Sequence, residues 1–282
     1  MKQHKEKGGI LLFESWHGKH NVGSSRIRGH WLVKNWPELE VFKQGQEYSF
    51  IIFQKCYWPQ FANKFDGVKI LDICDADWLE TQPVKAMIDE VDAITCSTNA
   101  ITDYIKQLTN KPVLTIPDRQ DLEFLDKPKV HKGKAKSVVW FGYAHNAKVL
   151  DVVVGALKRY KLKLTVISEL RPPYSKADEN VKWELDTVNK NIRKHDIVLM
   201  PQKEDGRFAY KSNNKIINSW ALGMPVATNP DELKRFIDPD ERNKEVELRF
   251  NEVKEKWDVK LSVKELQNLI EEIKNGKAKI KD

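Results

Sequence analysis

The chain of 282 residues has the length of two domains of ordinary size. Hydrophobic residues make up 40% of it and charged residues 32%, and its nine Trp, eleven Phe and seven Tyr exclude a disordered chain because they can bury ample apolar surface. Its apolar runs are too short to cross a bilayer, and no apolar segment typical of a secretory signal follows residues 1–7. We therefore expect a soluble cytoplasmic protein with Cys56, Cys74 and Cys96 as buried thiols.

The net charge of +7 is unevenly distributed along the chain. Residues 127–163 carry ten Lys or Arg and one acid, Asp151, for a local balance of +9, so the remaining residues sum to −2. A concentrated positive segment favours a polyanionic partner such as DNA, and the alternative is a solvated linker. Few aromatic residues are interspersed among these lysines, whereas a surface that stacks single-stranded bases requires them.

The first half alternates between strand-like and helix-like patterns. Short apolar runs rich in β-branched and aromatic residues predict strands at 9–13, 48–53, 68–74, 91–96 and 112–116. Helical periodicity between them predicts helices at 25–36, 81–89 and 98–108. Strands separated by helices indicate parallel βαβ units and an α/β layer structure.

Residues 117–136 interrupt this alternation with two prolines, a glycine and several lysines, which predicts a linker. A second alternation then predicts strands at 137–141, 162–167, 196–200 and 225–228, with helices at 147–160, 186–194, 213–222 and 231–236. Residues 241–281 place Leu266, Leu269, Ile270 and Ile273 at helical spacing, so they predict one or two amphipathic surface helices.

The fold class that follows is α/β, with two Rossmann-like, doubly wound domains facing each other across a cleft. We expect an N-terminal domain at 1–118, a linker at 119–136, a C-terminal domain at 137–240 and C-terminal helices at 241–282. In such a fold the ligand site lies at the carboxyl ends of the strands, in the cleft.

The segment 211–226 carries the most specific pattern. Ser212 is suited to N-cap the helix that follows it, and Gly223 to the left-handed position that ends the helix. Lys211 precedes the helix and Lys215 lies in its first turn, where positive charge opposes the helix dipole. An anion such as a diphosphate would neutralise both lysines, with Asn214 as a neutral donor. The alternative is an ordinary amphipathic helix with incidental lysines.

This segment resembles the donor-binding helix of GT-B glycosyltransferases, particularly the retaining glycogen-synthase-like and sucrose-synthase-like group (family 4). In that group, a helix that ends in Ala-x-Gly-x-Pro-Val binds the diphosphate and ribose of a nucleotide sugar. Three other stretches are similar to family segments: a small-residue loop with an arginine at 23–29, a strand and loop at 138–146, and a helix–strand unit at 91–97 with 116–118. The resemblance covers about residues 10–236 and implies a shortened N-terminal domain.

The resemblance implies transfer of a sugar from a nucleotide diphosphate-sugar donor to an acceptor hydroxyl, with retention and without a metal or cofactor. Positive charge at the leaving diphosphate would come from Arg26 (or Arg28), Lys211 and Lys215. The implied donor-binding residues are Ser24, Ser25, Gly142, Tyr143, Ser212, Asn213, Asn214 and Asn218.

The chain departs from this group at one pair of positions. The group commonly has two glutamates eight positions apart, where this chain has Tyr210 and Asn218. Asn218 can still hydrogen-bond a hydroxyl. The alternative functions are therefore a non-catalytic nucleotide-sugar-binding protein or a nucleic-acid-binding protein on the same fold. The acceptor could be a glycan, or a modified DNA base attracted by the basic segment 127–163.

The acceptor side is expected at His17, Asp75, Asp77 and Trp78. Asp75 and Asp77 follow a strand in a DxD pattern, which another class of glycosyltransferase uses to hold a divalent metal. Two doubly wound domains do not suit that class. We therefore favour a cleft-facing loop that contributes to the acceptor site. The alternative is that Asp75 caps the next segment. His17 and His20 form a close pair without a third ligand nearby, so no metal site is expected.

Overall fold

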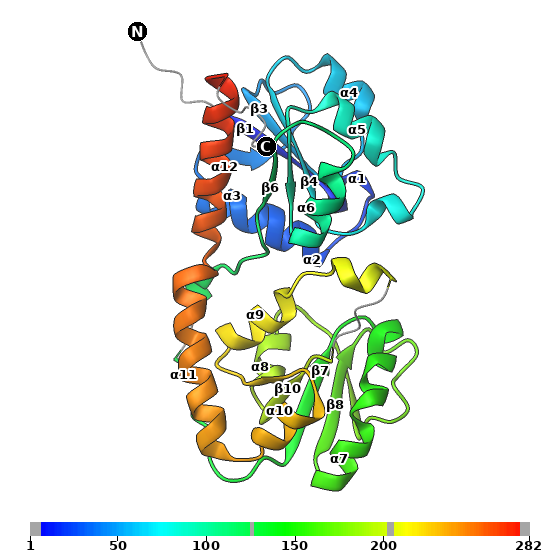
Figure 1. Cartoon of the computed structure of the whole chain (residues 1–282), viewed down its shortest axis with the longest axis vertical. Helices are drawn as coiled ribbons and strands as arrows, with labels where there is room; N and C mark the ends of the chain where they lie inside the picture. Colours follow the sequence, from blue (N-terminus) through cyan, green and yellow to red (C-terminus); the bar gives the residue numbers. More distant parts are fainter. Residues whose placement is uncertain (1–6, 125–126, 202–205, 277–282) are drawn as a thin grey trace. The chain divides into compact units, whose positions relative to one another are not determined.

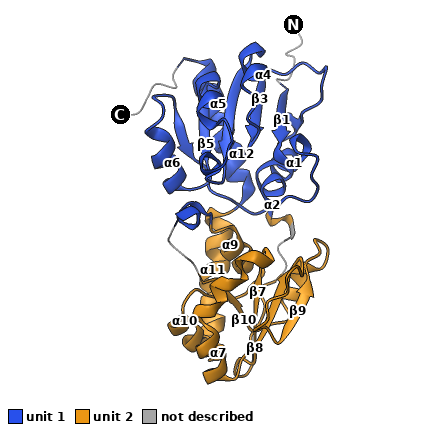
Figure 2. Cartoon of the chain, turned by 90° about the vertical axis from the view of Figure 1, so that its right-hand side faces the viewer, with its two compact units in different colours: residues 1–121, 205–212, 258–282 blue, residues 122–204, 213–257 orange. Residues whose placement is uncertain are grey.

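The computed structural model describes residues 7–124, 127–201 and 206–276 and divides into two compact units. Unit 1 comprises residues 1–121, 205–212 and 258–282, and unit 2 comprises residues 122–204 and 213–257 (Figure 2). Each unit contains a parallel sheet with helices packed on it, which confirms the predicted α/β class with two parallel-sheet domains. Within the described ranges, no helix combines the length and apolar character needed to cross a membrane.

The sheet of unit 1 has the strand order β2-β1-β3-β4-β5-β6, and its paired strands run parallel. Its strands are β1 (Gly8–Leu12), β2 (Leu39–Val41), β3 (Phe50–Gln54), β4 (Val68–Ile73), β5 (Ala93–Cys96) and β6 (Val113–Thr115). The five predicted strands lie within two residues of observed ones. The short edge strand β2 was not predicted because it has only three residues, one of them a glutamate.

Helices cover both faces of this sheet (Figure 1). The helices of unit 1 are α1 (Phe13–Trp16), α2 (Gly23–Ser25), a π-helix (Arg26–His30), α3 (Trp31–Asn35), α4 (Pro59–Lys64), α5 (Val84–Glu90), α6 (Asn99–Lys106) and α12 (Val259–Lys274), with short 3₁₀ turns at Asp77–Leu79 and Gly206–Tyr210. The predicted helix 25–36 is therefore a run of three segments, a π-helix between two α-helices. Gly29 allows this run to approach β1, because a Cβ there would lie 2.2 Å from Leu12 Cδ2.

The path of the chain creates a switch point between β1 and β3. Side chains of α3 and α12 share a hydrophobic core with Ile10 and Ile52 on one face of the sheet. Side chains of α4, α5 and α6 share a second core with Ile51 and Phe53 on the other face. The chain therefore turns to opposite faces after β1 and after β3, and in α/β sheets the carboxyl ends at such a point are where ligands bind.

The sheet of unit 2 has the strand order β11-β10-β7-β8-β9, and its paired strands run parallel. Its strands are β7 (Ser137–Phe141), β8 (Lys163–Ser168), β9 (Glu179–Lys182), β10 (Ile197–Leu199) and β11 (Val226–Ala227). Its helices are a 3₁₀-helix (Ala144–Val152), α7 (Val154–Tyr160), α8 (Val188–Ile192), α9 (Asn214–Ala221), α10 (Pro230–Arg235) and α11 (Pro239–Lys256), and a 3₁₀ turn lies at Leu122–Phe124. The predicted helix 147–160 is thus a 3₁₀-helix followed by an α-helix, and the edge strand β9 was not predicted.

The C-terminal amphipathic helices exist but belong to different units. Both begin at an aspartate, since Asp238 and Asp258 accept a backbone N–H in the first turn of α11 and α12. Helix α11 is part of unit 2, whereas α12 packs Leu266 and Ile270 into the core of unit 1. The observed division therefore differs from the predicted single segment 241–282.

The boundary between the two units, at residues 121 and 122, lies in the predicted linker, but several residues of this segment are buried. Asp118, Arg119 and Gln120 are buried in unit 1, where Arg119 pairs with Glu265 of α12 at 2.6 Å. His131 is buried in unit 2. Buried ion pairs and hydrogen bonds permit this polar segment to leave solvent. The reading of 127–163 as a solvated linker is also wrong, because residues 137–163 form β7, the 3₁₀-helix and α7.

The three cysteines are buried in unit 1 without disulfides, as predicted. Cys56 follows β3, Cys74 follows β4, and Cys96 ends β5. Burial raises the pKa of the Cys96 thiol to about 12, so this thiol is uncharged near neutral pH.

Candidate functional site

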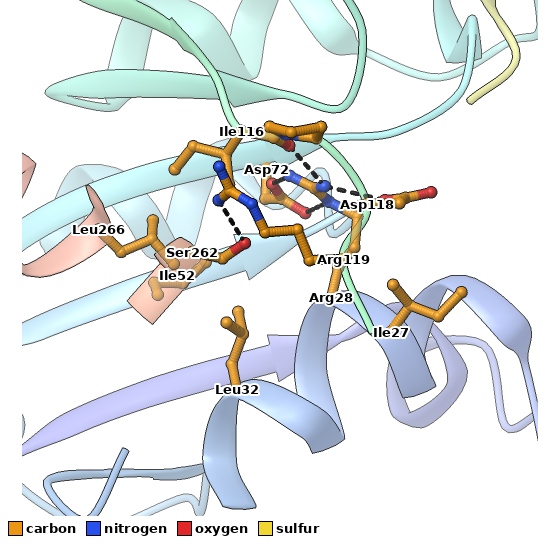
Figure 3. Close-up of a pocket in the computed structure, with 11 residues that line it drawn as sticks. Ile27, Arg28, Leu32, Ile52, Asp72, Ile116, Asp118, Arg119, Ser262 and Leu266 are labelled. Atoms are coloured by element: carbon orange, nitrogen blue, oxygen red, sulfur yellow. Dashed lines mark hydrogen bonds and ion pairs between the residues drawn. The ribbon is translucent and has the colours of Figure 1, made fainter. Parts of the chain in front are cut away.

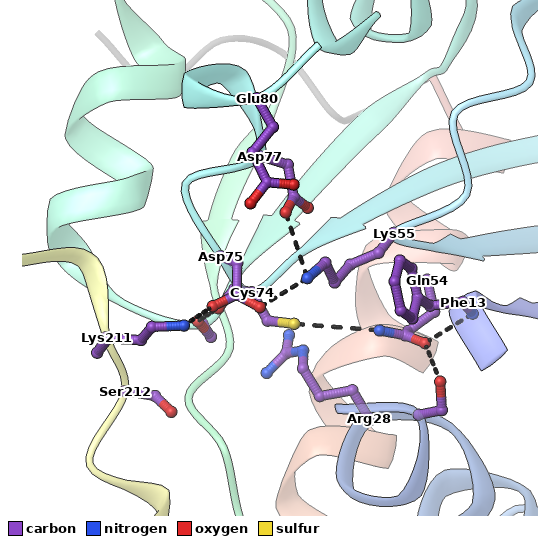
Figure 4. Close-up of polar contacts among 12 residues, drawn as sticks. Phe13, Arg28, Gln54, Lys55, Cys74, Asp75, Asp77, Glu80, Lys211 and Ser212 are labelled. Atoms are coloured by element: carbon purple, nitrogen blue, oxygen red, sulfur yellow. Dashed lines mark hydrogen bonds and ion pairs between the residues drawn. The ribbon is translucent and has the colours of Figure 1, made fainter. Parts of the chain in front are cut away.

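A cluster of charged side chains lies at the carboxyl ends of β3 and β4 in unit 1 (Figure 4). Lys55 directly follows β3, and its Nζ lies 2.6 Å from Asp75 Oδ2 and 3.2 Å from Asp77 Oδ1. Lys211 forms an ion pair with the other oxygen of Asp75. The parallel register of β3 and β4 brings these loops together. Two expected acceptor-side residues therefore lie together, around a lysine that the sequence reasoning missed.

Lys55 is held in an unusual backbone conformation. Its φ is +54°, in the left-handed region, and its side chain is only 9% exposed. For a residue other than glycine, this backbone conformation costs about 1–2 kcal/mol of conformational energy. Such strained residues are often found at functional sites. Burial opposes the charge of Lys55, yet the neighbouring negative groups raise its pKa above the usual value. The lysine is therefore a fixed positive charge between two carboxylates.

The two aspartates have pKa values shifted in opposite directions. Burial raises the pKa of Asp77, although Lys55 and the Tyr57 hydroxyl, which donates to Asp77 Oδ2 at 2.7 Å, favour its charged form. Burial also acts to raise the pKa of Asp75, but Lys55 and Lys211 hold it below the usual value. All four carboxylate oxygens of this pair thus contact a lysine or Tyr57.

This arrangement corrects one interpretation of the DxD segment. Asp75 does not cap the following 3₁₀ turn, since the N-cap residue is Ala76 and no side chain caps the turn. Across residues 7–124, 127–201 and 206–276, no three His, Cys, Asp or Glu side chains gather as metal ligands. The Lys55 ammonium lies between Asp75 and Asp77, where a metal bridging them would have to bind.

Lys211 and Ser212 belong to unit 1, whereas Lys215 belongs to unit 2. Ser212 Oγ donates to Asp118 Oδ2 at 2.5 Å, so the prediction that it caps the next helix is wrong. The N-cap residue of α9 is Asn213, and no side chain caps that helix. The expectation that Lys211 and Lys215 share one anion had ignored Asp75, which pairs with Lys211 from a distant part of the chain.

Arg28 is a structural residue of unit 1, as Figure 3 shows. Its guanidinium donates to both oxygens of Asp72 at 2.5 and 2.8 Å and to Asp118 Oδ1 at 2.9 Å, and its side chain is 6% exposed. The adjacent cavity has a volume of only about 10 Å³, enough for about one water molecule. Of the two arginines considered for the leaving group, Arg26 is therefore the better candidate.

The small-residue loop 23–29 is already engaged within unit 1. Ser25 is fully buried, and its hydroxyl donates to Gln54 Oε1 at 3.0 Å and accepts from the Glu14 N–H at 3.1 Å. This hydroxyl ties the helix start to β3, so we do not assign Ser25 to the donor. Ser24 and Arg26 are half-buried on the same helical run.

His17 and Trp78 differ in their surroundings. His17 is exposed and packs on the Phe13 ring at 4.4 Å, and partial burial together with Lys19 and Lys55 lowers its pKa. Trp78 stacks on Tyr104 at 4.1 Å and meets the edge of Tyr210 at 5.0 Å. Tyr210, at a position where the resembled group has a glutamate, is thus a packing residue of unit 1.

In unit 2, Gly142 and Lys215 meet at the carboxyl end of β7. A Cβ on Gly142 would lie 2.6 Å from Lys215 Nζ and 2.9 Å from the Trp140 ring, so the glycine leaves room for the ammonium. The Lys215 ammonium lies 5.5 Å from the centre of the Trp140 ring. Strand β7 has β8 on one side and β10 on the other, so this corner is the switch point of the second sheet.

Other expected donor residues of unit 2 are neighbours of Gly142 and Lys215 in the sequence. Tyr143 follows Gly142 and is 60% exposed. Asn214 and Asn218 lie one turn apart and therefore share a face of α9. Gly223 has the left-handed φ of +68° that was predicted after α9, and a Cβ there would lie 2.5 Å from the Lys129 backbone nitrogen.

Part of the basic segment lines a surface cavity of unit 2 with a volume of about 310 Å³. Lys158, Lys161 and Lys163 border it, together with Lys176 from the next connection. It lies where α7 ends and β8 begins, so it is at the amino edge of the sheet, opposite to Gly142. Three lysines of the basic segment, which was predicted to attract a polyanion, thus lie together beside one cavity of unit 2.

The sequence matches no protein-family profile, and comparison with curated proteins finds no similar sequence. Solved structures are similar in fold. A DNA modifying enzyme, β-glucosyltransferase, has a TM-score of 0.59 and 10% identity over 94% of this chain and 99% of its own. AviGT4, a glycosyltransferase involved in avilamycin A biosynthesis, has a TM-score of 0.56 and 11% identity over 96% of this chain and 98% of its own.

Longer proteins match as well. TarM has a TM-score of 0.58 and 11% identity over 78% of this chain, and the chain spans only 54% of TarM. The chain likewise spans 57% of the matching chain in the GtfA/B complex. At these identities the likeness concerns the fold alone. The chain therefore has the α/β fold with two parallel-sheet domains that GT-B glycosyltransferases share.

Proposed function

We propose that the protein is a glycosyltransferase that moves a sugar from a nucleotide diphosphate-sugar donor to an acceptor hydroxyl. The single observation that carries this proposal is Lys215, which the first turn of α9 directs to Gly142 at the carboxyl end of β7. An ammonium beside the start of a helix is a suitable partner for a diphosphate. The GT-B fold of the chain supports sugar transfer by analogy with glycosyltransferases of the same fold.

Unit 2 would bind the donor. Lys215 and the backbone N–H groups at the start of α9 would hold the diphosphate, and Asn218 would hydrogen-bond a ribose hydroxyl. As the bond to the sugar breaks, negative charge grows on the leaving phosphate, and a fixed positive charge stabilises that state most.

Unit 1 would bind the acceptor near Asp75. Each oxygen of Asp75 and Asp77 already contacts a lysine or Tyr57, so neither carboxylate is placed to take a proton from the acceptor without losing a contact. This arrangement favours a route in which the departing phosphate takes the acceptor proton, as the resemblance to the retaining group implies. We therefore propose retention without a metal.

The acceptor is either a glycan or a modified DNA base. One of the fold neighbours of nearly equal length is a DNA modifying enzyme, and the lysines beside the cavity of unit 2 would suit a phosphate backbone. A second candidate function is donor binding without catalysis. Tyr210 favours it, because an aromatic packing residue replaces a glutamate of the resembled group.

One experiment tests the proposed function directly. Purified protein is incubated with a panel of nucleotide sugars, and release of the nucleoside diphosphate is measured with and without candidate acceptors. Hydrolysis or transfer of one donor is the expected result, and NMR of the product gives the anomeric configuration. Binding of a donor without any release would support the non-catalytic candidate, and no binding of any donor or nucleoside diphosphate would refute both.

A further inference from the structure

Two tryptophans, one exposed and one half-buried, form an aromatic surface at the switch point of unit 1. Trp16 ends the short helix after β1, and Trp58 lies in the connection after β3. Their ring centres are 4.8 Å apart with a tilt of 39°, and Trp16 is 40% exposed. The proposed function above assigns neither residue a role.

The fold supports this surface from beneath. Trp58 stacks on Phe61 at 4.6 Å with a tilt of only 20°, and Phe61 packs against the core of the sheet. Burial of apolar surface is favourable, so the exposed part of the Trp16 side chain forgoes stabilisation of the fold. Because β1 and β3 are adjacent, the two indoles lie at the edge where α/β sheets bind ligands.

The loop beside this surface carries one lysine, two histidines and one acid. His17, Lys19 and His20 directly follow Trp16 in the sequence, and Lys19 Nζ lies 5.0 Å from the centre of the Phe13 ring. The nearest acid in this loop, Glu14, contacts His30 at 2.5 Å. Residues 13–20 thus combine aromatic and basic side chains, a combination typical of surfaces that bind single-stranded nucleic acid.

The surface also adjoins the acceptor side of the proposed site. Phe13 lies one helical turn before Trp16, and its ring centre is 4.9 Å from Lys55 Nζ. Lys55 in turn contacts Asp75 and Asp77. A ring stacked on Trp16 would therefore lie close to the cluster that we assign to the acceptor hydroxyl.

We propose that Trp16 and Trp58 stack an unpaired nucleobase of a nucleic acid strand, while Lys19 contacts its phosphate backbone. The proposal rests on the proposed function, because it makes the acceptor a hydroxyl carried by that base. Lys19 favours phosphodiesters over a neutral glycan, since an uncharged sugar chain gains nothing from its ammonium charge.

The experiment compares two labelled oligonucleotides of equal length by fluorescence anisotropy, one with bases and one abasic. The wild-type chain is expected to bind the oligonucleotide with bases more tightly by roughly 5- to 100-fold, the range that stacking on aromatic side chains provides. Trp16→Ala removes this preference and leaves binding of the abasic strand unchanged, whereas Trp16→Phe keeps most of it. Lys19→Gln weakens binding of both strands alike.

The matched control is Leu248→Ala, which changes an apolar side chain that is 60% exposed on α11 and should leave both affinities unchanged. Equal wild-type affinity for the two strands would overturn the proposal, as would a Trp16→Ala variant that keeps the preference. Displacement of the strand by a neutral oligosaccharide would assign the surface to a glycan instead. Binding of nucleoside diphosphates is measured on the same samples, so failure of the donor site remains distinguishable.

Discussion

A Cβ on Gly142 would lie 2.6 Å from Lys215 Nζ, so the position of the ammonium depends on the absence of a side chain after β7. We therefore expect Gly142→Ala to displace Lys215 and weaken binding of nucleoside diphosphates by about tenfold. Lys215→Ala should weaken it by roughly 10- to 150-fold, the range of 1.5–3 kcal/mol for a charge-assisted hydrogen bond. Calorimetric titration measures both effects.

The control for this pair is Gly155→Ala in α7, where a new Cβ would meet no atom within 4 Å. It should leave ligand affinity unchanged. The folded Lys215→Ala protein without ligand should be as stable as the wild type or slightly more stable, because a lysine opposes the helix dipole at the start of α9. Unchanged affinity in both Gly142→Ala and Lys215→Ala would rule out this diphosphate site.

Lys211 is expected to behave differently from Lys215. Its side chain is 49% exposed and pairs with Asp75 within unit 1, so Lys211→Ala should cost at most about 1 kcal/mol of stability. The affinity for nucleoside diphosphates should stay within about twofold of the wild type. A loss as large as that of Lys215→Ala would restore the prediction from sequence that both lysines hold one diphosphate.

Asp75→Asn separates two routes for the acceptor proton. Under the retaining route the variant loses an ion-pair partner of Lys55 and Lys211 but no proton acceptor, so the turnover number should fall less than about tenfold. Loss of a general base would reduce it by roughly 10²- to 10⁴-fold. Rates at saturating donor and acceptor decide between them, and a loss in the larger range would contradict the proposed retention.

Turnover should be insensitive to chelation. Lys55 supplies the cation between Asp75 and Asp77, at distances of 2.6 and 3.2 Å. Activity with excess EDTA should therefore equal activity without it. Loss of turnover in EDTA that added manganese restores would show instead that the two carboxylates bind a metal during the reaction.

The strands could be predicted from sequence because their apolar runs are long enough to mark a buried core. The exceptions are the edge strands β2 and β9, whose segments Leu39–Val41 and Glu179–Lys182 are short and only partly buried. A strand with one exposed edge needs fewer apolar residues, so it leaves a weak pattern. The burial of the start of the predicted linker was missed because it depends on partners as distant as Glu265.

Local patterns predicted Asp75, Asp77 and Lys215 as site residues, and the family resemblance predicted Gly142; each follows a strand or begins a helix. They did not identify Lys55, because its role depends on the parallel register of β3 and β4 and on a left-handed φ. They also assigned Ser212 to a helix cap, since helix rules consider neighbours in sequence and not a carboxylate 94 residues away. Contacts distant in sequence are the part that required the structure.

His131 should make unit 2 less stable in mild acid. It is 3% exposed, its Nε2 lies 3.2 Å from the Gly223 carbonyl oxygen, and burial lowers its pKa to about 4. Below about pH 6.5 the unfolded chain binds a proton that the folded chain excludes, so the free energy of unfolding falls as the pH falls toward 4.

Between pH 6.5 and 5 the expected loss from His131 is on the order of 1–2 kcal/mol, which denaturant titration can resolve. His131→Gln should remove that part of the pH dependence, whereas His20→Gln, a change at an exposed histidine, should not. Burial also lowers the pKa of His195, so the test is the difference between the His131 variant and the wild type rather than the total slope. An identical slope in the two proteins would show that His131 takes up its proton without unfolding unit 2.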